Sequence, residues 1–169
     1  IMALDSIQKQ LLEQVADLHE VPTGAYNIRA NGESAGRNTT ANIDIVTKTD
    51  KPGIDIIIKP GTKNESVHIP VLLSESGIKE TVYNDFFIGE GADVTIVAGC
   101  GVHSDDEADA KHNGIHRFFL GKDCKVLYKE KHIGTGKGKG AKRINPVTDA
   151  YLEEGAVLTM DTIQLSGVD

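Results

Sequence analysis

The spacing of hydrophobic residues changes once along the chain. Near the N-terminus they recur at intervals of three and four, which places them on one face of an α-helix. These residues are Leu4, Ile7, Leu11, Val15 and Leu18. Asp5 or Ser6 can cap the helix, and Pro22 ends it. We therefore predict an amphipathic helix within residues 1–22 that packs on the rest of the protein; the alternative is that it docks in a partner's groove.

After Pro22 the pattern becomes that of β-strands. Short runs of β-branched residues alternate with turns rich in Gly, Pro, Asn and Asp, as is typical of an all-β protein. The runs are "ANIDIVTKTD", "GIDIIIKPG", "SVHIPVLLSE", "ADVTIVAG", "IHRFFLG", "KVLYKEKH" and "AVLTMDTIQL". We predict that residues 23–169 form one all-β core.

A repeat of constant period runs through this core, because the step from Phe87 to Phe119 equals the step from Phe119 to Tyr151. Its copies are Phe87–Ile96, Phe119–Tyr128 and Tyr151–Met160, and a weaker copy lies in "IIIKPGTKNESV". Such a period indicates stacked units that bury their apolar faces against one another. Because these units are made of strands, we predict a parallel β-helix, or β-solenoid.

The last clear copy is followed by only a few residues. We expect the chain to be a fragment of a longer solenoid, incomplete at the C-terminus. An interrupted solenoid presents unpaired strand edges. We therefore expect self-association through the C-terminal coil, near Met160–Leu165.

Composition narrows the class of protein. The chain has 169 residues, which suits one domain, and its formal net charge of −7 argues against nucleic-acid binding. The apolar run Ile54–Pro60 is far shorter than the roughly 20 residues that span a membrane. The first residues do not resemble a secretory signal, and two cysteines do not make a disulfide framework. We expect a reduced, cytoplasmic protein.

Residues with metal-ligand chemistry cluster between Ile96 and Gly121. They are Cys100, His103, His112 and His116, whose side chains suit zinc or iron, although their spacing is irregular. His112 and His116 have the spacing of a zinc-binding helix, but the Asn-Gly pair between them is turn chemistry and makes a helix improbable. The segment "HSDDEADAKH" is most simply a solvated acidic loop.

The repeat separates the two cysteines. Cys124 aligns with Ala92 and Ala156, which predicts a small structural residue in a tight inner corner. Cys100 aligns with His132 and Gln164.

Strand alternation places Val126, Tyr128, Glu130 and His132 on one face. Glu130 and His132 then either form a buried polar site or follow a bend that turns them outward. We favour the bend, because buried ionisable groups are rare unless they are partnered.

Two interpretations of Cys100 follow. In the first, Cys100 and His132 lie on adjacent coils about 4.8 Å apart, with Glu130 nearby, and form a cluster, sulfur or metal site. His103, His112 and His116 would be loop residues around it. The imidazole would drive the thiol toward thiolate. In the second, Cys100 packs as a small residue, His132 faces solvent, and the loop between Val102 and His116 shifts the register.

The segment Gly134–Arg143, "GTGKGKGAKR", superficially looks like a phosphate-binding loop. A P-loop needs Ser or Thr after Gly-Lys and then a helix, and neither follows here. We predict a mobile, basic surface loop.

Four segments of the chain together form a specific set of motifs: "ADVTIVAGCGVH", "HNGIHRFFLGKDCKVLYKEKHIGTG", "INPVTDAYLEEGA" and "IQLSGVD". They resemble the SufB/SufD family of iron–sulfur cluster assembly proteins. The likeness is strongest to the single-gene SufB-like form of archaea and anaerobes, and runs from about Gly24 to the end. It implies a right-handed parallel β-helix and a cytosolic, non-catalytic scaffold. The implied partners are SufC, an ABC-type ATPase, and a second SufB/SufD-like subunit.

Two departures from the family matter. Members often carry extra cysteines after the "GCG-hydrophobic-His" motif, and "SDDEADAK" has none. By the same resemblance, we expect the C-terminal half and the terminal helices that would bind the ATPase to be absent from these 169 residues. The resemblance implies an iron–sulfur cluster in the full-length complex, whereas two cysteines would give at most a partial site.

Two other classes of function remain as alternatives. One is a β-solenoid hydrolase or lyase acting on polysaccharides, for which Asp105, Asp106, Glu107 and Asp109 are the nearest acidic group. Glycosidases hold two carboxylates across the bond that breaks, and these four crowd one loop. The other is a purely structural solenoid for protein interaction.

Overall fold

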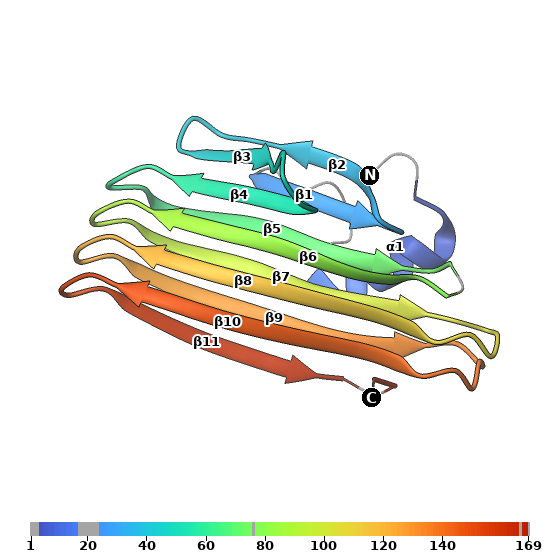
Figure 1. The fold of residues 1–169 in the computed structure, drawn as a ribbon. Coiled ribbons are helices and arrows are strands. Elements are labelled where there is room, and N and C mark those ends of the chain that lie inside the picture. Colours follow the sequence, from blue (N-terminus) through green and yellow to red (C-terminus); the bar gives the residue numbers. More distant parts are fainter. Residues whose placement is uncertain (1–3, 17–23, 76, 166, 169) are drawn as a thin grey trace.

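The computed structural model describes residues 4–16, 24–75, 77–165 and 167–168, and in them the chain forms one helix and eleven strands (Figure 1). The elements are α1 (Ser6–Ala16), β1 (Ala25–Ala30), β2 (Glu33–Asn38), β3 (Ile43–Thr47), β4 (Gly53–Ile58), β5 (Lys63–Leu73), β6 (Lys79–Ile88), β7 (Asp93–His103), β8 (Ala110–Leu120), β9 (Lys125–Thr135), β10 (Lys142–Leu152) and β11 (Val157–Gln164).

The strands form two sheets that face each other across a shared core. One sheet has the order β11-β9-β7-β5-β1-β2 and the other β10-β8-β6-β4-β3. From β6 onward, strands that pair within a sheet are parallel and offset by one length of the repeat, as in Cys100↔His132 and Ile144↔His112. The predicted β-solenoid is therefore confirmed, with about three coils.

The turns between the sheets explain the constant spacing of the repeat. At one end of the coils, the third residue of each four-residue turn has a left-handed backbone: Gly61 (φ 74°), Gly91 (φ 71°), Asp123 (φ 59°) and Gly155 (φ 76°). Each turn is closed by a backbone hydrogen bond, such as Thr62 N to Lys59 O at 3.3 Å. Pro60 followed by Gly61 suits a type II turn. The weaker copy of the repeat in "IIIKPGTKNESV" is thus a real coil turn.

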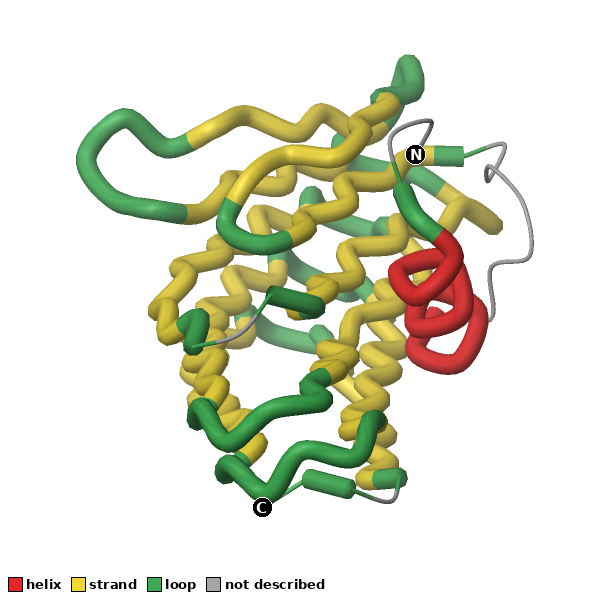
Figure 2. The backbone as a smooth tube through the Cα atoms, turned by 90° about the vertical axis from the view of Figure 1, so that its right-hand side faces the viewer, coloured by secondary structure: helices red, strands yellow, loops and turns green. Residues whose placement is uncertain are grey.

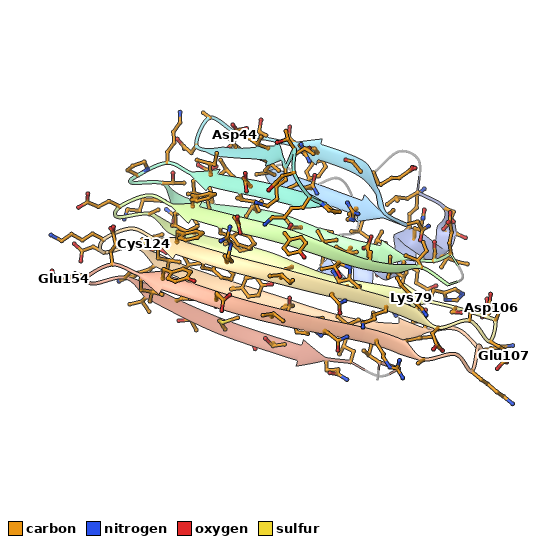
Figure 3. The ribbon with its side chains drawn as sticks, in the orientation of Figure 1. Asp44, Lys79, Asp106, Glu107, Cys124 and Glu154 are labelled. Atoms are coloured by element: carbon orange, nitrogen blue, oxygen red, sulfur yellow. The ribbon has the colours of Figure 1, made fainter. Side chains whose placement is uncertain are left out.

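The core is apolar at this end of the coils. Phe86 and Phe118 stack there with ring centroids 4.5 Å apart. Cys124 is fully buried in the same region, as predicted for a structural cysteine. In Figure 3, Cys124 and Glu154 lie at one end of the coils, and Asp106 and Glu107 lie at the opposite end.

Two antiparallel hairpins extend the solenoid at its N-terminal side. β1 pairs with β2, and β3 pairs with β4. The first hairpin turns at Asn31 and Gly32, both with positive φ (50° and 82°), which is the geometry that tight Asn-Gly hairpins adopt. The hairpins bring β1, β2 and the segment after β3 to one side of the molecule.

Helix α1 lies on the outer face of the first sheet (Figure 2). It begins with a reciprocal cap, in which Gln8 N donates to Asp5 Oδ1 (2.8 Å) and Asp5 N donates to Gln8 Oε1 (3.0 Å). Leu11 and Val15 are buried against the sheet, so the predicted packing on the protein's own body is confirmed.

The helix prediction is wrong at one position and untested at two others. Ile7 is exposed (37%) and Leu12 is buried in its place, so the expected stripe is wrong at that position. Leu18 and Pro22 lie outside the described residues. Among the residues that the structure describes, no helix has the length and apolar character that crossing a bilayer requires.

Two turn and loop predictions are only partly right. No helix forms at Asn113-Gly114, as predicted, but the pair is not a turn and lies inside β8, because the chain reverses earlier, between His103 and Ala110. The middle of the basic segment is a surface loop between β9 and β10, as predicted, and it packs against the turn before β8. Gly136 and Gly138 pack so closely on the backbone of Ser104 and Asp106 that a side chain would collide there. Lys137 N also donates to Asp105 Oδ1 at 3.0 Å.

Candidate functional site

Strand β8 supplies two histidines to the inside of the solenoid. Its residues alternate between the interior and the outer face along their whole length, which buries His112, Gly114 and His116. Both histidines are only 5% exposed. The prediction that they are loop residues is therefore wrong, because the turn before β8 is shorter than the acidic segment suggested.

The opposite sheet supplies Glu130 and His132. Both are buried (6% and 4% exposed), so the expected outward bend does not occur. Each has a partner. Tyr128 Oη donates to Glu130 Oε1 at 2.7 Å, and His132 Nε2 lies 3.3 Å from Glu130 Oε2. These bonds meet the condition under which ionisable groups are tolerated inside proteins.

Glu130 determines where the protons lie in this network. Burial tends to raise its pKa, but the hydrogen bond from His132, the imidazole of His116 and the hydrogen bond from Tyr128 together lower the pKa below its usual value. The ionised carboxylate only accepts hydrogen bonds. Tyr128 therefore donates its proton to Glu130.

His116 has a defined tautomer as a consequence. Its Nδ1 lies 3.0 Å from Tyr128 Oη. Since the Tyr128 proton points to Glu130, His116 Nδ1 must be the donor in this contact. Burial lowers the pKa of His116 to about 4, so the ring is neutral near pH 7 and Nε2 has a free lone pair.

Glu80 is the carboxylate partner of the second histidine, His112. His112 Nδ1 lies 2.9 Å from Glu80 Oε1, and Arg29 donates to Glu80 Oε2 at 3.2 Å. Burial tends to raise the pKa of Glu80, but its bonds to His112 and Arg29 lower it overall. Glu80 is not among the residues predicted from the sequence. The repeat carried the signal for it, because Glu80 and His112 are register partners one repeat apart.

Gly114 leaves room for the two imidazoles. A Cβ atom at this position would lie 2.9 Å from His116 Nε2 and 3.5 Å from His112 Nε2. The two nitrogens therefore approach the same point inside the coil. A side chain at Gly114 would occupy that point.

A cavity of about 20 Å³ lies beside these rings. Cys100, Glu130, His132 and Asn84 line it as well. Its volume suits about one water molecule. Asn84 is 6% exposed, and its Oδ1 has no hydrogen-bond partner among the described residues. An acceptor of this kind gives a bound water or another donor a place to attach.

Cys100 faces this cavity from β7. It is 2% exposed, and it is the register partner of His132 on β9. The register runs unbroken to His103↔Thr135, so the predicted column is confirmed and the shifted-register alternative is wrong. Leu11 and Val15 of α1 contact the neighbouring Gly101, so the helix shields this strand from outside.

The expected thiolate is not supported. Burial, followed by the negative charges of Glu80 and Glu130, raises the pKa of the Cys100 thiol well above its usual value. His132 directs its Nε2 at Glu130, and no hydrogen bond joins it to Cys100 within the described part of the chain. The thiol is protonated in this state.

The structure does not bring every candidate together. Cys124 aligns with Ala92, eight residues before Cys100, so the two thiols are about 25 Å apart along the strands. His103 lies at the coil edge, bonded to Thr135 (2.7 Å) and Asp105 (3.0 Å). The described residues contain no group of three or more His, Cys, Asp or Glu side chains arranged to hold a metal ion.

Comparison with known proteins finds no match: no family model, no curated protein and no solved structure corresponds to this chain.

Proposed function

We propose that the protein is a scaffold subunit for SUF-type iron–sulfur cluster assembly and has no catalytic turnover of its own. Its partners would be a SufC-like ABC-type ATPase and a second SufB/SufD-like subunit, and it would act in the cytoplasm. The resemblance of its motifs to the SufB/SufD family suggests this role. The observation that carries the proposal is the placement of Cys100 inside the coil, beside His132 and facing the His112–His116 pair.

The site has the chemistry to hold a soft ligand. The raised pKa of Cys100 keeps its thiol protonated until a positive or electrophilic group binds nearby. A cation near sulfur reverses that preference and deprotonates the thiol. Glu130 and His132 line the same cavity as the thiol.

One chain cannot enclose a cluster with the residues described here. Clusters are held mainly by several cysteine thiolates, and Cys124 is remote from Cys100 and tightly packed. The iron–sulfur cluster is thus cargo, and Cys100 contributes one of several ligands. The others would come from a partner subunit or from outside the described residues.

The arrangement of the carboxylates on the acidic turn argues against the alternative function of a polysaccharide hydrolase. Asp105, Asp106, Glu107 and Asp109 lie on one turn between β7 and β8. Asp105 and Asp109 accept backbone hydrogen bonds from Lys137 and Ala141 of the next turn. They therefore stabilise the stack of turns and do not face each other across a substrate groove.

Anaerobic reconstitution tests the proposal. The protein, its Cys100→Ala variant and the matched Cys124→Ala variant are incubated with iron, sulfide, the ATPase and the second SufB/SufD-like subunit, and visible absorption is recorded. We expect chromophore formation by the wild type and by Cys124→Ala, and its loss in Cys100→Ala. Co-purification of the ATPase is measured in parallel. A colourless wild-type protein that also fails to bind the ATPase would overturn the proposal.

A further inference from the structure

A second cavity, separate from the Cys100 site, is lined by basic side chains. It has a volume of about 180 Å³ and lies beside the two N-terminal hairpins. Arg29 of β1, Arg37 of β2, and Lys48 and Lys51 of the β3–β4 connection line it, together with Asn27, Ser34 and Thr47. None of the described residues that line it is acidic. The chain as a whole has a net charge of −7, whereas the lining of this cavity is positively charged.

Two of the four cations are neutralised by neighbouring carboxylates. Lys48 Nζ lies 2.6 Å from Asp55 and 2.8 Å from Asp85. Arg29 pairs with Glu80 at 3.2 Å. These two side chains shape the wall of the cavity and contribute little net charge to it.

The other two cations keep their charge. Arg37 donates from Nε to Asn27 Oδ1 (2.8 Å) and from Nη1 to Thr47 Oγ1 (2.9 Å), and both acceptors are neutral. These bonds hold the guanidinium in place and leave Nη2 available. Lys51 Nζ sits 4.7 Å from the centre of the Tyr83 ring. Among the described residues, neither Arg37 nor Lys51 forms an ion pair with a carboxylate.

The backbone holds Lys51 at the cavity. Tyr83 N donates to Pro52 O at 2.9 Å, which ties the β3–β4 connection to β6. Gly53 has a φ of 137°, and a Cβ atom there would collide with the backbone of Tyr83. The close approach therefore requires glycine at this position, and it fixes the segment that carries Lys51, which lines the cavity together with Arg37.

We propose that this pocket binds a small oxyanion of the phosphate type. Fixed guanidinium and ammonium donors are the usual partners of phosphate oxygens. Hydroxyl groups of Ser34 and Thr47 add further polar lining. The volume equals that of about six water molecules and is below the roughly 300 Å³ at which pockets for drug-sized ligands begin. It suits a free phosphate, and a nucleotide would not fit inside.

Arg29 of this pocket also bonds Glu80, the partner of His112, so the test variants change Lys51 and Arg37 and leave Arg29 in place. Apart from that link, the pocket is distinct from the Cys100 cavity. It shares no lining residue with the Cys100 cavity within the described part of the chain. Loss of anion binding in the Lys51 or Arg37 variants should therefore leave cluster reconstitution unchanged, and loss of the chromophore in Cys100→Ala should leave anion binding unchanged.

The test is thermal unfolding of the chain in sodium phosphate against sodium chloride of equal ionic strength, with affinity measured by titration calorimetry. Phosphate should raise the midpoint in a saturable way. Lys51→Gln should weaken phosphate binding by at least about fivefold, since a charge-assisted hydrogen bond is lost. Lys129→Gln, which removes the same charge from an exposed position on β9, is the matched control and should bind as the wild type does.

Arg37→Gln serves as the second variant and should also lose affinity. Adenosine monophosphate provides a further arm and should bind no more tightly than inorganic phosphate. The proposal is overturned if phosphate and chloride act alike, or if Lys129→Gln weakens binding as much as Lys51→Gln. Tighter binding of the nucleotide would refute the assignment to a small anion.

Discussion

Acid should destabilise this protein through His116 at a pH where its carboxylates are still ionised. The ring is buried and neutral, and burial lowers its pKa from 6.5 to about 4. In the unfolded chain the same histidine becomes protonated below about pH 6.5. Between these values the unfolded state binds the additional proton, so the free energy of unfolding must fall as the pH falls.

The magnitude follows from the shift. About 2.5 pH units at about 1.4 kcal/mol per unit give a loss of about 3 kcal/mol between pH 6.5 and pH 4. The charged and titratable groups that face the ring are Glu130, His112, His132 and Tyr128. Glu130 has a lowered pKa, so the stability it contributes is lost only below its unfolded value of 4.5. The interval from pH 6.5 to 4.5 therefore separates the histidine from this carboxylate.

Urea unfolding at a series of pH values, followed by far-ultraviolet circular dichroism, measures the effect. His116→Gln removes the titrating ring and should flatten the dependence in this interval. His103→Gln removes an imidazole from the coil edge, leaves His116 in place, and should keep the contribution of His116. An unfolding free energy that stays constant from pH 6.5 to 4.5, or an unchanged slope in His116→Gln, would refute the reasoning.

Three further predictions concern stability and are measured by urea unfolding at pH 7. Tyr128→Phe should lower the free energy of unfolding by about 1–3 kcal/mol, because Glu130 and His116 both lose a buried partner; an unchanged free energy would contradict the network. Asp123→Ala should cost about 1 kcal/mol and Asp123→Gly less, because the backbone there is left-handed (φ 59°); equal effects would argue against the turn geometry. Gly99→Ala should be more damaging than Gly61→Ala, because a Cβ at Gly99 would meet Lys131 and Val15 whereas at Gly61 it meets open space; the reverse order would show that α1 is not packed as described.

Much of the architecture is readable in the sequence because the solenoid repeats one local pattern. The constant offset that relates Phe87, Phe119 and Tyr151 is the strand register itself, and it correctly placed Cys100 beside His132. The alignment of Cys124 with Ala92 was equally predictable, because turns of the same length place corresponding residues of successive coils next to each other. Residues one repeat apart in the sequence are paired on neighbouring parallel strands, so their offset in the sequence predicts where they lie in space.

The tertiary structure alone decided what the inward side chains meet in the opposite sheet. Strand alternation put Tyr128, Glu130 and His132 on the inner face of β9, where Tyr128 and His132 partner the carboxylate. The tertiary structure adds His116, which reaches the Tyr128 hydroxyl from the opposite sheet. Repeat spacing relates residues within one sheet, whereas the contact between Tyr128 and His116 crosses between sheets, so no periodicity of the chain encodes it. The same reason applies to the basic pocket, where Arg37 and Lys51 line one cavity because the hairpins fold their separate segments together.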